Sequence, residues 1–473
     1  MTVIARALDG SSIELKEQAI TSLTASLRGT VITGSDPRYD TARTLWNAMI
    51  DRRPALIVRC LGTADVLTAV NFARERGLLL AVRGGGHNIA GLALADGAVV
   101  LDMSAMRGVF VNREKRVANA QAGCLLGDVD QETQLHGLAT VLGFISATGI
   151  AGLTLGGGFG YLTRRYGWSC DNVESFQVVL ADGKLVTASE RSEPELFWAL
   201  RGGGGNFGVV TDFEYKLYPV GPEIVGGAIA WRLEDVKEVF ELYRRVTADA
   251  PREMVCTMAL RLAAPVPWID RDAHGKPIVL FTVCDHGPVA EAEKRANLIK
   301  SFGKPVGDTL VRRPYTVMQS MFDAGQPNGR RRYWKSEYVE SVTSDLLETL
   351  LAHCTRIVSP LSALTLFPLN GKLNELPEDY SAAGNRKAGL LVNIMGAWEA
   401  AADDARNIEW ARAVWEACRK FSTGGTYVNI LTEEEADTRI HDAYGANYQR
   451  LAEIKAKYDP QNFFRVNKNI RPR

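Results

Sequence analysis

Three consecutive glycines, Gly84-Gly85-Gly86, stand directly before His87 in this chain of 473 residues. A turn without Cβ atoms can adopt positive φ angles and can bring its backbone N–H groups against an anion such as a diphosphate. The residues before it have the pattern of a strand (55–60), a helix (65–76) and a second strand (78–82). The sequence therefore predicts a strand, helix, strand order that leads into a ligand-binding loop.

This loop matches neither of the common phosphate-binding motifs. GxGxxG would need a glycine where Ile89 stands, and GxxxxGK[ST] would need a lysine that is missing. Gly203, Gly205 and Gly208 satisfy GxGxxG formally, but a predicted helix precedes them and a predicted strand follows. Because a dinucleotide-binding loop needs the opposite order, the sequence argues against a Rossmann fold.

A second glycine cluster occupies residues 147–160, ATGIAGLTLGGGFG. From Thr133 to Thr163 no side chain is charged unless His136 is protonated. The high glycine content argues against a membrane span. It favours backbone packed against a flat buried ring and its diphosphate, with plain close packing of loops as the alternative.

Composition narrows the class of partner. The chain has 55 basic and 55 acidic side chains, a balance that argues against nucleic acid or a membrane surface and favours a small molecule. Seven scattered cysteines without a CxxC pair predict neither a metal site nor a disulfide framework. The N-terminus has no apolar signal segment, so a cytoplasmic location is expected. The sequence leaves the oligomeric state open between monomer and homodimer.

The segment RGGGHNIAG (83–91), followed by LADGAVVLDMSAM, resembles the berberine bridge enzyme-like FAD-linked oxidases of the vanillyl-alcohol oxidase superfamily, including bacterial members of the hydroxynicotine oxidase type. The similarity continues through 147–160 and 195–211 and returns in the last fifty residues. It implies an α+β fold. The first domain (1–220, core from about 50) would be a PCMH-type FAD-binding domain of two α/β subdomains. A substrate domain with an antiparallel sheet backed by helices would follow (221–422), and a C-terminal segment (423–473) would return to the first domain.

The resemblance implies that FAD is bonded covalently to His87 through its 8α-methyl group. Family members with a second covalent bond have a cysteine about four residues before Gly149, where this chain has Ile145, so a single bond is expected. The resemblance also implies a set of cofactor-binding residues: Arg83, Gly84, Gly85, Gly86, His87, Asn88, Gly91, Thr148, Gly149, Ile150, Gly152, Leu153, Gly156, Gly157, Gly158, Asp171, Asn172, Gly208, Val209, Val210, Asn467 and Asn469.

The implied reaction is hydride transfer from a small alcohol, sugar or amine of secondary metabolism to flavin N5, with O2 as acceptor and H2O2 as product. Tyr427 is the candidate base, although a phenol with a pKa of about 10 needs a nearby cation or hydrogen bond to act near neutral pH. Ile150 is expected to influence oxygen access. In the substrate domain, residues 333–336 and Trp398 are the most suggestive aromatic and cationic features. The alternatives are a dehydrogenase with another acceptor, a flavin-fold cyclase and a non-enzymatic binding module.

Overall fold

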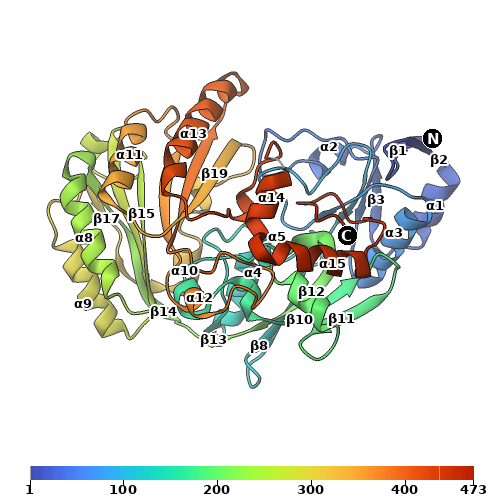
Figure 1. The fold of residues 1–473 in the computed structure, drawn as a ribbon, viewed down its shortest axis with the longest axis horizontal. Helices are drawn as coiled ribbons and strands as arrows, with labels where there is room; N and C mark the ends of the chain where they lie inside the picture. The colour runs from blue at the N-terminus through green and yellow to red at the C-terminus, as the bar shows by residue number, and fades with distance from the viewer. Residues whose placement is uncertain (1, 436) are drawn as a thin grey trace.

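The computed structural model describes residues 2–435 and 437–473. Figure 1 shows two halves, with the N-terminal part of the chain on the right and the helix-backed substrate sheet on the left. The predicted α+β class is confirmed, because mixed and antiparallel sheets occur together with helices that cover them. Among the described residues, no helix combines the length and apolarity that a membrane crossing requires.

The first sheet carries the glycine loop. Its strands lie in the order β3 (Thr30–Thr33), β4 (Leu56–Arg59), β6 (Val99–Asp102) and β5 (Leu80–Arg83), and β4, β6 and β5 are parallel. Helix α3 (Thr63–Glu75) connects β4 to β5, which confirms the predicted order. Because β5 ends at Arg83, the glycines follow at the carboxyl edge of the parallel strands, where open α/β sheets bind ligands.

The remaining elements of the N-terminal part surround this sheet. A hairpin of β1 (Val3–Arg6) and β2 (Ser12–Leu15) precedes α1 (Glu17–Ala25) and α2 (Tyr39–Ala42). Helix α2 ends at Ala42, and the chain beyond it turns toward the substrate domain, where the backbone of Asn47 bridges to that of Arg330.

The second sheet of this half is antiparallel, in the order β11 (Leu185–Ser189), β10 (Val173–Val179), β12 (Val209–Lys216), β8 (Val117–Gln121) and β7 (Val109–Asn112). A hairpin turn at Asp182-Gly183 joins β10 to β11. Strands β9 (Leu138–Ala139) and β13 (Tyr218–Pro219) pair beside it. Its helices are α4 (Leu126–Gln134), α5 (Ile150–Leu155), α6 (Thr163–Tyr166) and α7 (Pro194–Leu200). Helix α5 lies within the second glycine cluster, where no helix was predicted.

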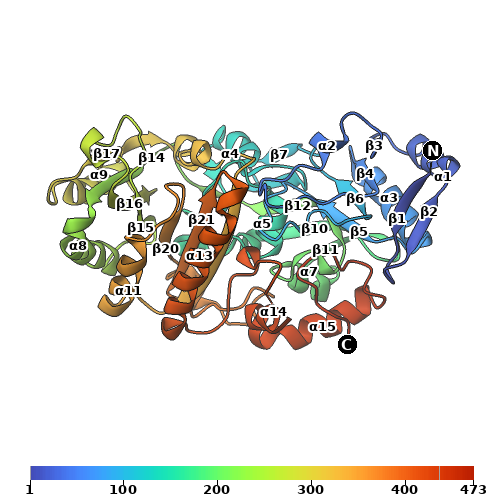
Figure 2. The ribbon, with the colours of Figure 1, turned by 90° about the horizontal axis from the view of Figure 1, so that it is seen from above.

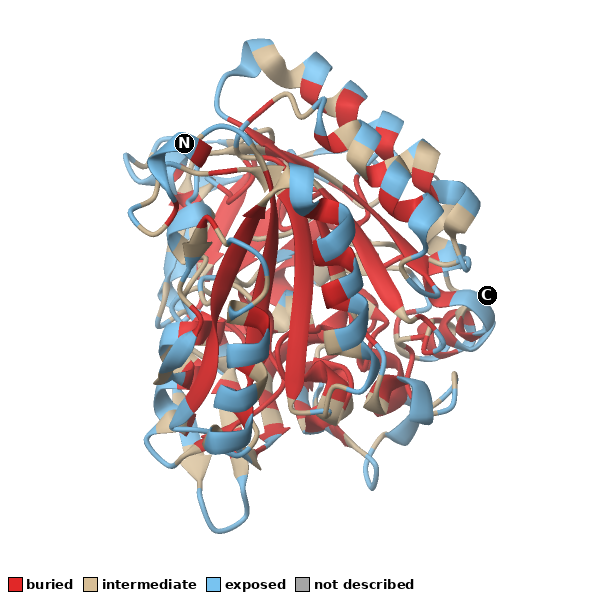
Figure 3. Cartoon of the chain, turned by 90° about the vertical axis from the view of Figure 1, so that its left-hand side faces the viewer, coloured by how far each residue is buried: buried red, intermediate tan, exposed pale blue. Residues whose placement is uncertain are grey.

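The substrate domain contains a long antiparallel sheet. The strand order is β17 (Gly307–Asp308), β14 (Glu223–Arg232), β16 (Pro277–Asp285), β15 (Met254–Leu262), β20 (Ala363–Pro368), β21 (Leu390–Trp398) and β19 (Arg331–Val339), and β18 (Val311–Pro314) also pairs with β14. Its helices are α8 (Val236–Ala248), α9 (Val289–Lys300), α10 (Tyr315–Gln319), α11 (Ser344–Cys354), α12 (Lys372–Glu375) and α13 (Asp404–Cys418). Figure 3 shows buried strands behind helices whose outer faces are exposed.

The two faces of this sheet differ in character. Alternate residues such as Leu260, Phe281 and Ile394 join the apolar core beneath the helices. Because successive side chains of a strand point to opposite faces, the residues between them face the other half of the molecule. This second face forms one wall of the cavity described below.

The last part of the chain, with α14 (Asp437–Tyr444) and α15 (Tyr448–Tyr458), returns to the first half, and Figure 2 shows α15 beside α7. Leu451, Phe463 and Ile470 belong to the same apolar core as the strands of the first half. Ala382, from within the predicted substrate domain, belongs to this core too. The segment around Ala382 therefore connects the two halves through packing.

Candidate functional site

A cavity of about 740 Å³ lies between the two halves. Its lining combines the glycine loop, the second glycine cluster and 208–210 from the first half with the inner face of the substrate sheet and parts of 427–430 and 464–468. Most of its lining is apolar, and its size is that of a cofactor or ligand site.

The two glycine clusters meet at the cavity floor. A Cβ atom on Gly85 would lie 2.4 Å from the backbone nitrogen of Gly149, and a Cβ on Gly149 would lie equally close to the nitrogen of Gly85. Both positions therefore require glycine because two backbones approach each other, and this contact joins the loop after β5 to the start of α5.

Replacing Gly85 with alanine should destabilise this contact. The new methyl group would overlap backbone, which cannot move aside like a side-chain end, so we expect a loss of about 1–3 kcal/mol of unfolding free energy and a lower flavin content. Chemical denaturation and the visible spectrum measure both effects. Gly34→Ala is the matched control, since no atom lies within 4 Å of its added Cβ. Equal stability of the two variants would contradict the assigned role of Gly85.

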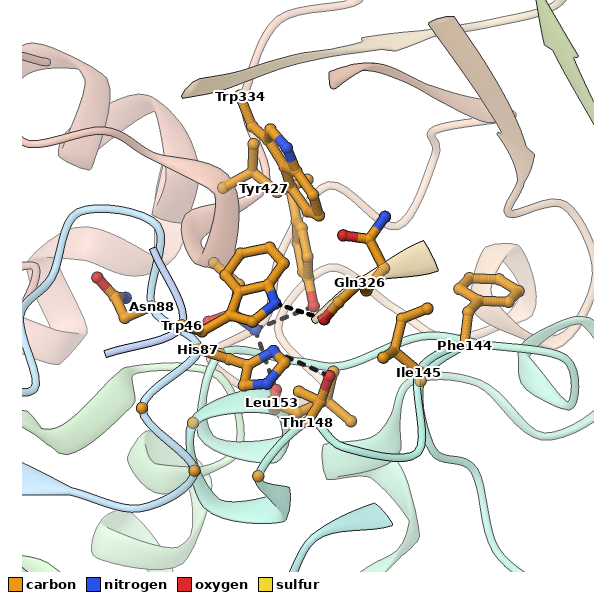
Figure 4. A pocket seen from close by; sticks show the side chains of 18 of the residues that line it. Trp46, His87, Asn88, Phe144, Ile145, Thr148, Leu153, Gln326, Trp334 and Tyr427 are labelled. Atoms are coloured by element: carbon orange, nitrogen blue, oxygen red, sulfur yellow. Dashed lines mark hydrogen bonds between the residues drawn. The ribbon is translucent and has the colours of Figure 1, made fainter. Parts of the chain in front are cut away.

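His87 is held in a stack of rings at one end of the cavity (Figure 4). The Trp46 ring lies 4.7 Å from the imidazole with an interplanar angle of 14°, and Trp334 meets Trp46 edge-on at 5.4 Å. Nδ1 of His87 is 3.4 Å from Oγ1 of Thr148, and the indole N–H of Trp46 donates to the carbonyl of Gln326 at 3.0 Å. The imidazole is therefore fixed by Trp46 and Thr148 of the first half, and the substrate domain in turn holds Trp46 through Trp334 and Gln326.

Arg332 completes the stack from the substrate domain. Its guanidinium lies 3.8 Å from the Trp46 ring centroid and donates to the carbonyls of Trp46 and Pro327. Burial of His87, and secondarily the charge of Arg332, lower the pKa of the imidazole to about 4. His87 is therefore neutral at physiological pH, which leaves a ring nitrogen lone pair available as a nucleophile.

Tyr427 lies deeper in the same cavity, and its environment differs from that of a base. Its hydroxyl oxygen accepts hydrogen bonds from the backbone N–H of Gly158 at 3.1 Å and from Nδ2 of Asn429 at 3.0 Å. Burial nevertheless raises the pKa of Tyr427, and among the described residues no cation contributes to lowering it. The phenol is therefore protonated at neutral pH, and its own O–H can donate one hydrogen bond.

Strand register arranges the inner face of the substrate sheet in rows. Arg261 pairs with Ala363, Ala363 with Met395, and Met395 with Trp334, and all four line the cavity. The next row holds Leu280, Ala259, Thr365 and Asn393, which also line it. Most side chains of this wall are small or apolar, and a few isolated polar groups stand among them.

Many of the predicted site residues line this cavity: Gly84, Gly85, Gly86, His87, Asn88, Thr148, Gly149, Gly152, Leu153, Gly156, Gly208, Val209, Val210, Asn467 and Tyr427. The others lie outside its lining: Arg83, Gly91, Ile150, Gly157, Gly158, Asp171, Asn172 and Asn469. Ile150 is fully buried in the core of the first half, so its side chain does not face the cavity as the oxygen-access interpretation required. Asp171 forms an ion pair with Arg386.

The structure adds lining residues that the sequence analysis did not single out, including Trp46, Arg261, Asn393 and Lys468. Lys468 donates to the carbonyl of Thr432 at 2.9 Å, and burial lowers its pKa to about 8. Alternation along β15, in which Arg261 stands among buried apolar residues, is a sequence signal that could have identified one of them. Trp46 had no such local signal.

Several buried polar atoms at the cavity lack a hydrogen-bond partner among the described residues: Trp334 Nε1, Asn393 Oδ1, Tyr444 Oη and Asn467 Oδ1. A buried unpaired donor or acceptor costs about 1–3 kcal/mol, so these atoms indicate a polar ligand. With the glycine floor and the apolar walls, they fit a large, flat, hydrogen-bonding cofactor.

Comparison with known proteins agrees with this geometry. The model of the FAD binding domain matches residues 54–189, and the berberine and berberine-like model matches 426–471. (R)-6-hydroxynicotine oxidase of Paenarthrobacter nicotinovorans is 31% identical over 462 residues, which cover 94% of this chain and 97% of that protein. The chain belongs to the berberine bridge enzyme-like FAD-linked oxidoreductases.

Other relatives of this berberine bridge enzyme-like chain agree. An FAD-linked oxidoreductase of Dictyostelium discoideum is 30% identical over 463 residues, covering 96% of this chain and 97% of its own. The crystal structure of 6-hydroxy-D-nicotine oxidase from Arthrobacter nicotinovorans superposes with a TM-score of 0.84 at 28% identity and covers 95% and 99% of the two chains. A xylooligosaccharide oxidase from Myceliophthora thermophila shares the fold, with a TM-score of 0.83 at 21% identity over 96% and 99% of the chains. The predicted family and FAD-dependent oxidoreductase activity are thus confirmed.

Proposed function

We propose that this berberine bridge enzyme-like protein is an oxidase that holds FAD through one covalent bond from His87 to the flavin 8α-methyl group. The observation that carries the proposal is the neutral imidazole of His87, stacked on Trp46 at the end of the cavity. Ile145, at the position where bicovalent relatives have cysteine, also lines the cavity, and no described lining residue is a cysteine. Bound there, FAD would accept a hydride at N5 and pass the electrons to O2, giving H2O2.

The proposed cofactor contacts come mainly from the first half and the C-terminal segment. Glycines 84–86 and Gly149 offer backbone that can approach the ring and the diphosphate, and Val209 and Val210 offer a backbone edge. Asn467 offers an unpaired amide oxygen. The substrate, a small alcohol, sugar or amine, would lie against the inner face of the substrate sheet, where Ala259 and Ala363 leave space and Asn393 offers an acceptor.

The pH dependence of flavin attachment tests the state of His87. A pKa of about 4 means that the imidazole stays neutral down to mildly acidic pH. We expect apo-protein incubated with FAD to form covalent flavin at similar rates at about pH 5.5 and about pH 8, measured as fluorescence of the denatured chain in a gel. An unshifted pKa near 6.5 would leave roughly one tenth of the imidazole neutral at the lower pH. A rate roughly tenfold lower there would therefore contradict the assignment.

The structure leads us to propose that Tyr427 positions a ligand by donating a hydrogen bond, instead of acting as the base. Tyr427→Phe removes one hydrogen bond, so we expect kcat/KM to fall about 5- to 10-fold while the pH profile keeps its shape. Loss of a titrating limb from that profile would instead identify Tyr427 as the base. Tyr161→Phe, which changes another buried cavity-lining tyrosine, is the control for a general packing effect.

The oxidase proposal is tested by measuring whether O2 accepts the electrons of the reduced flavin. Purified holoenzyme is reduced anaerobically by candidate alcohols, sugars and amines, and air is then admitted while flavin absorbance and peroxide are followed. Rapid reoxidation with peroxide equivalent to the reduced flavin supports an oxidase. Sluggish reoxidation would favour a dehydrogenase with another acceptor, and product formation without net oxidation would favour a cyclase.

A further inference from the structure

Arg261 of the substrate sheet lines the cavity and has no counterion among the described residues. Arg261 lies on β15, in the row that continues through Ala363 and Met395 to Trp334. Three strand spacings separate Arg261 from Trp334, a distance of about 14 Å. Arg261 therefore lies toward the opposite side of the inner wall from the Trp46 and His87 stack.

The hydrogen bonds of Arg261 leave most of its guanidinium unused. Among the described residues, its one hydrogen bond runs from Nε to the carbonyl of Leu262 at 3.3 Å. Nearby Arg330, which also lines the cavity, donates from Nη1 to the carbonyl of Gly325 at 2.8 Å. Neither arginine has an ion-pair partner among the described residues, and no aspartate or glutamate occurs in the described cavity lining.

The positive charge of Arg330 disfavours the charged form of Arg261. Burial lowers the pKa of Arg261, and the charge of Arg330 lowers it further. A half-buried guanidinium beside a second cation costs free energy unless an anion joins them. Arginine presents a planar array of donors that matches a carboxylate, so the missing group has a defined chemistry.

We propose that Arg261 and Arg330 form a subsite for a carboxylate and that the natural substrate carries such an anionic group. This proposal rests on the proposed function, in which the same cavity holds both the cofactor and the substrate. The exposed residues Pro265, Ala324 and Gly325 line the cavity close in sequence to the two arginines. The carboxylate would therefore lie at the part of the cavity bordered by these loops.

The diphosphate of FAD is a less suitable anion for these residues. Both arginines belong to the substrate domain, whereas the glycine loops that can approach a diphosphate belong to the first half. Lys468, the remaining lysine or arginine of the described lining, belongs to the C-terminal segment that packs on the first half. The positive charge on the inner face of the substrate domain is therefore available to bind the substrate.

The test uses holoenzyme and the probes benzoate and benzamide, which have a similar shape and differ in charge. Each is titrated at low salt while the flavin spectrum and the melting temperature are recorded. We expect saturable binding of benzoate, weaker binding of benzamide, and weakening of benzoate binding by about 10- to 100-fold in Arg261→Gln. Arg330→Gln should act in the same direction. Arg271→Gln, at an exposed arginine outside the cavity lining, should leave benzoate binding unchanged.

Arg261→Gln should also keep or raise the melting temperature of the probe-free enzyme, because it removes a half-buried charge that has no ion-pair partner among the described residues. A purely structural arginine would instead lower it. The proposal is overturned if benzoate binds no better than benzamide, if neither readout responds to benzoate, or if Arg261→Gln binds it as the parent does. Acid precipitation and peroxide release, measured on the same protein, report separately on the His87 bond and the oxidase reaction.

Discussion

Replacing His87 with alanine is expected to abolish covalent flavin entirely. The imidazole is the only lining group, among the described residues, that combines a neutral nitrogen nucleophile with a fixed position beside Trp46 and Thr148. The glycine floor and the sheet wall remain in the variant, so FAD should still bind, but reversibly. Acid precipitation measures the outcome: under the proposal, flavin should stay with the parent pellet and should move to the supernatant for the variant.

The control for this experiment is His136→Ala, which removes an exposed histidine that does not line the cavity. It should keep its flavin in the acid pellet and its full turnover. If the His87→Ala pellet retained flavin, the covalent assignment would be wrong, although the family membership would stand. If that variant bound no flavin at all and melted at a much lower temperature, His87 would be needed for the fold instead.

The local part of the site was predictable from the sequence, and its distant partners were not. The glycine loop and His87 are contiguous and follow a strand, so one short pattern predicted both. Trp46, which stacks on His87, precedes it by 41 positions in the sequence. Arg332, which lies over Trp46, follows Trp46 by 286 positions. No periodicity in the chain encodes such pairings, because they arise when the two halves pack together.

The sheet of the substrate domain shows the same limit. The family resemblance implied an antiparallel sheet in this domain, but it did not predict that β20 lies between β15 and β21. This order places Arg261 and Trp334, which are 73 positions apart, in one row of the cavity wall. Pairing between strands that are not consecutive depends on tertiary packing, which short patterns do not record.

Asp171 illustrates how a motif can predict a residue's importance and miss its role. Family resemblance assigned it to the cofactor, but the structure pairs it with Arg386, 215 positions away. The two side chains are 2% and 1% exposed, and the guanidinium donates to both carboxylate oxygens at 2.9 and 2.7 Å. Arg386 also donates to Oγ of Ser381 at 2.7 Å. This pair joins the first half to the segment that contains Ala382.

Asp171→Asn is therefore expected to lower the free energy of unfolding by about 3–5 kcal/mol, because it leaves the guanidinium of Arg386 buried without an anion. Denaturant titration of the holoenzyme measures the loss.

Asp171→Asn/Arg386→Met should recover most of the lost unfolding free energy, since removal of both charges also removes the desolvation cost. Glu291→Gln, which breaks an exposed pair with Lys294, should cost less than about 1 kcal/mol. If the single variant lost flavin but kept its stability, Asp171 would act on the cofactor after all. If the single variant lost stability and the double variant did not recover it, the hydrogen bond from the backbone of Trp168 to Asp171 would contribute more to the unfolding free energy than the ion pair does.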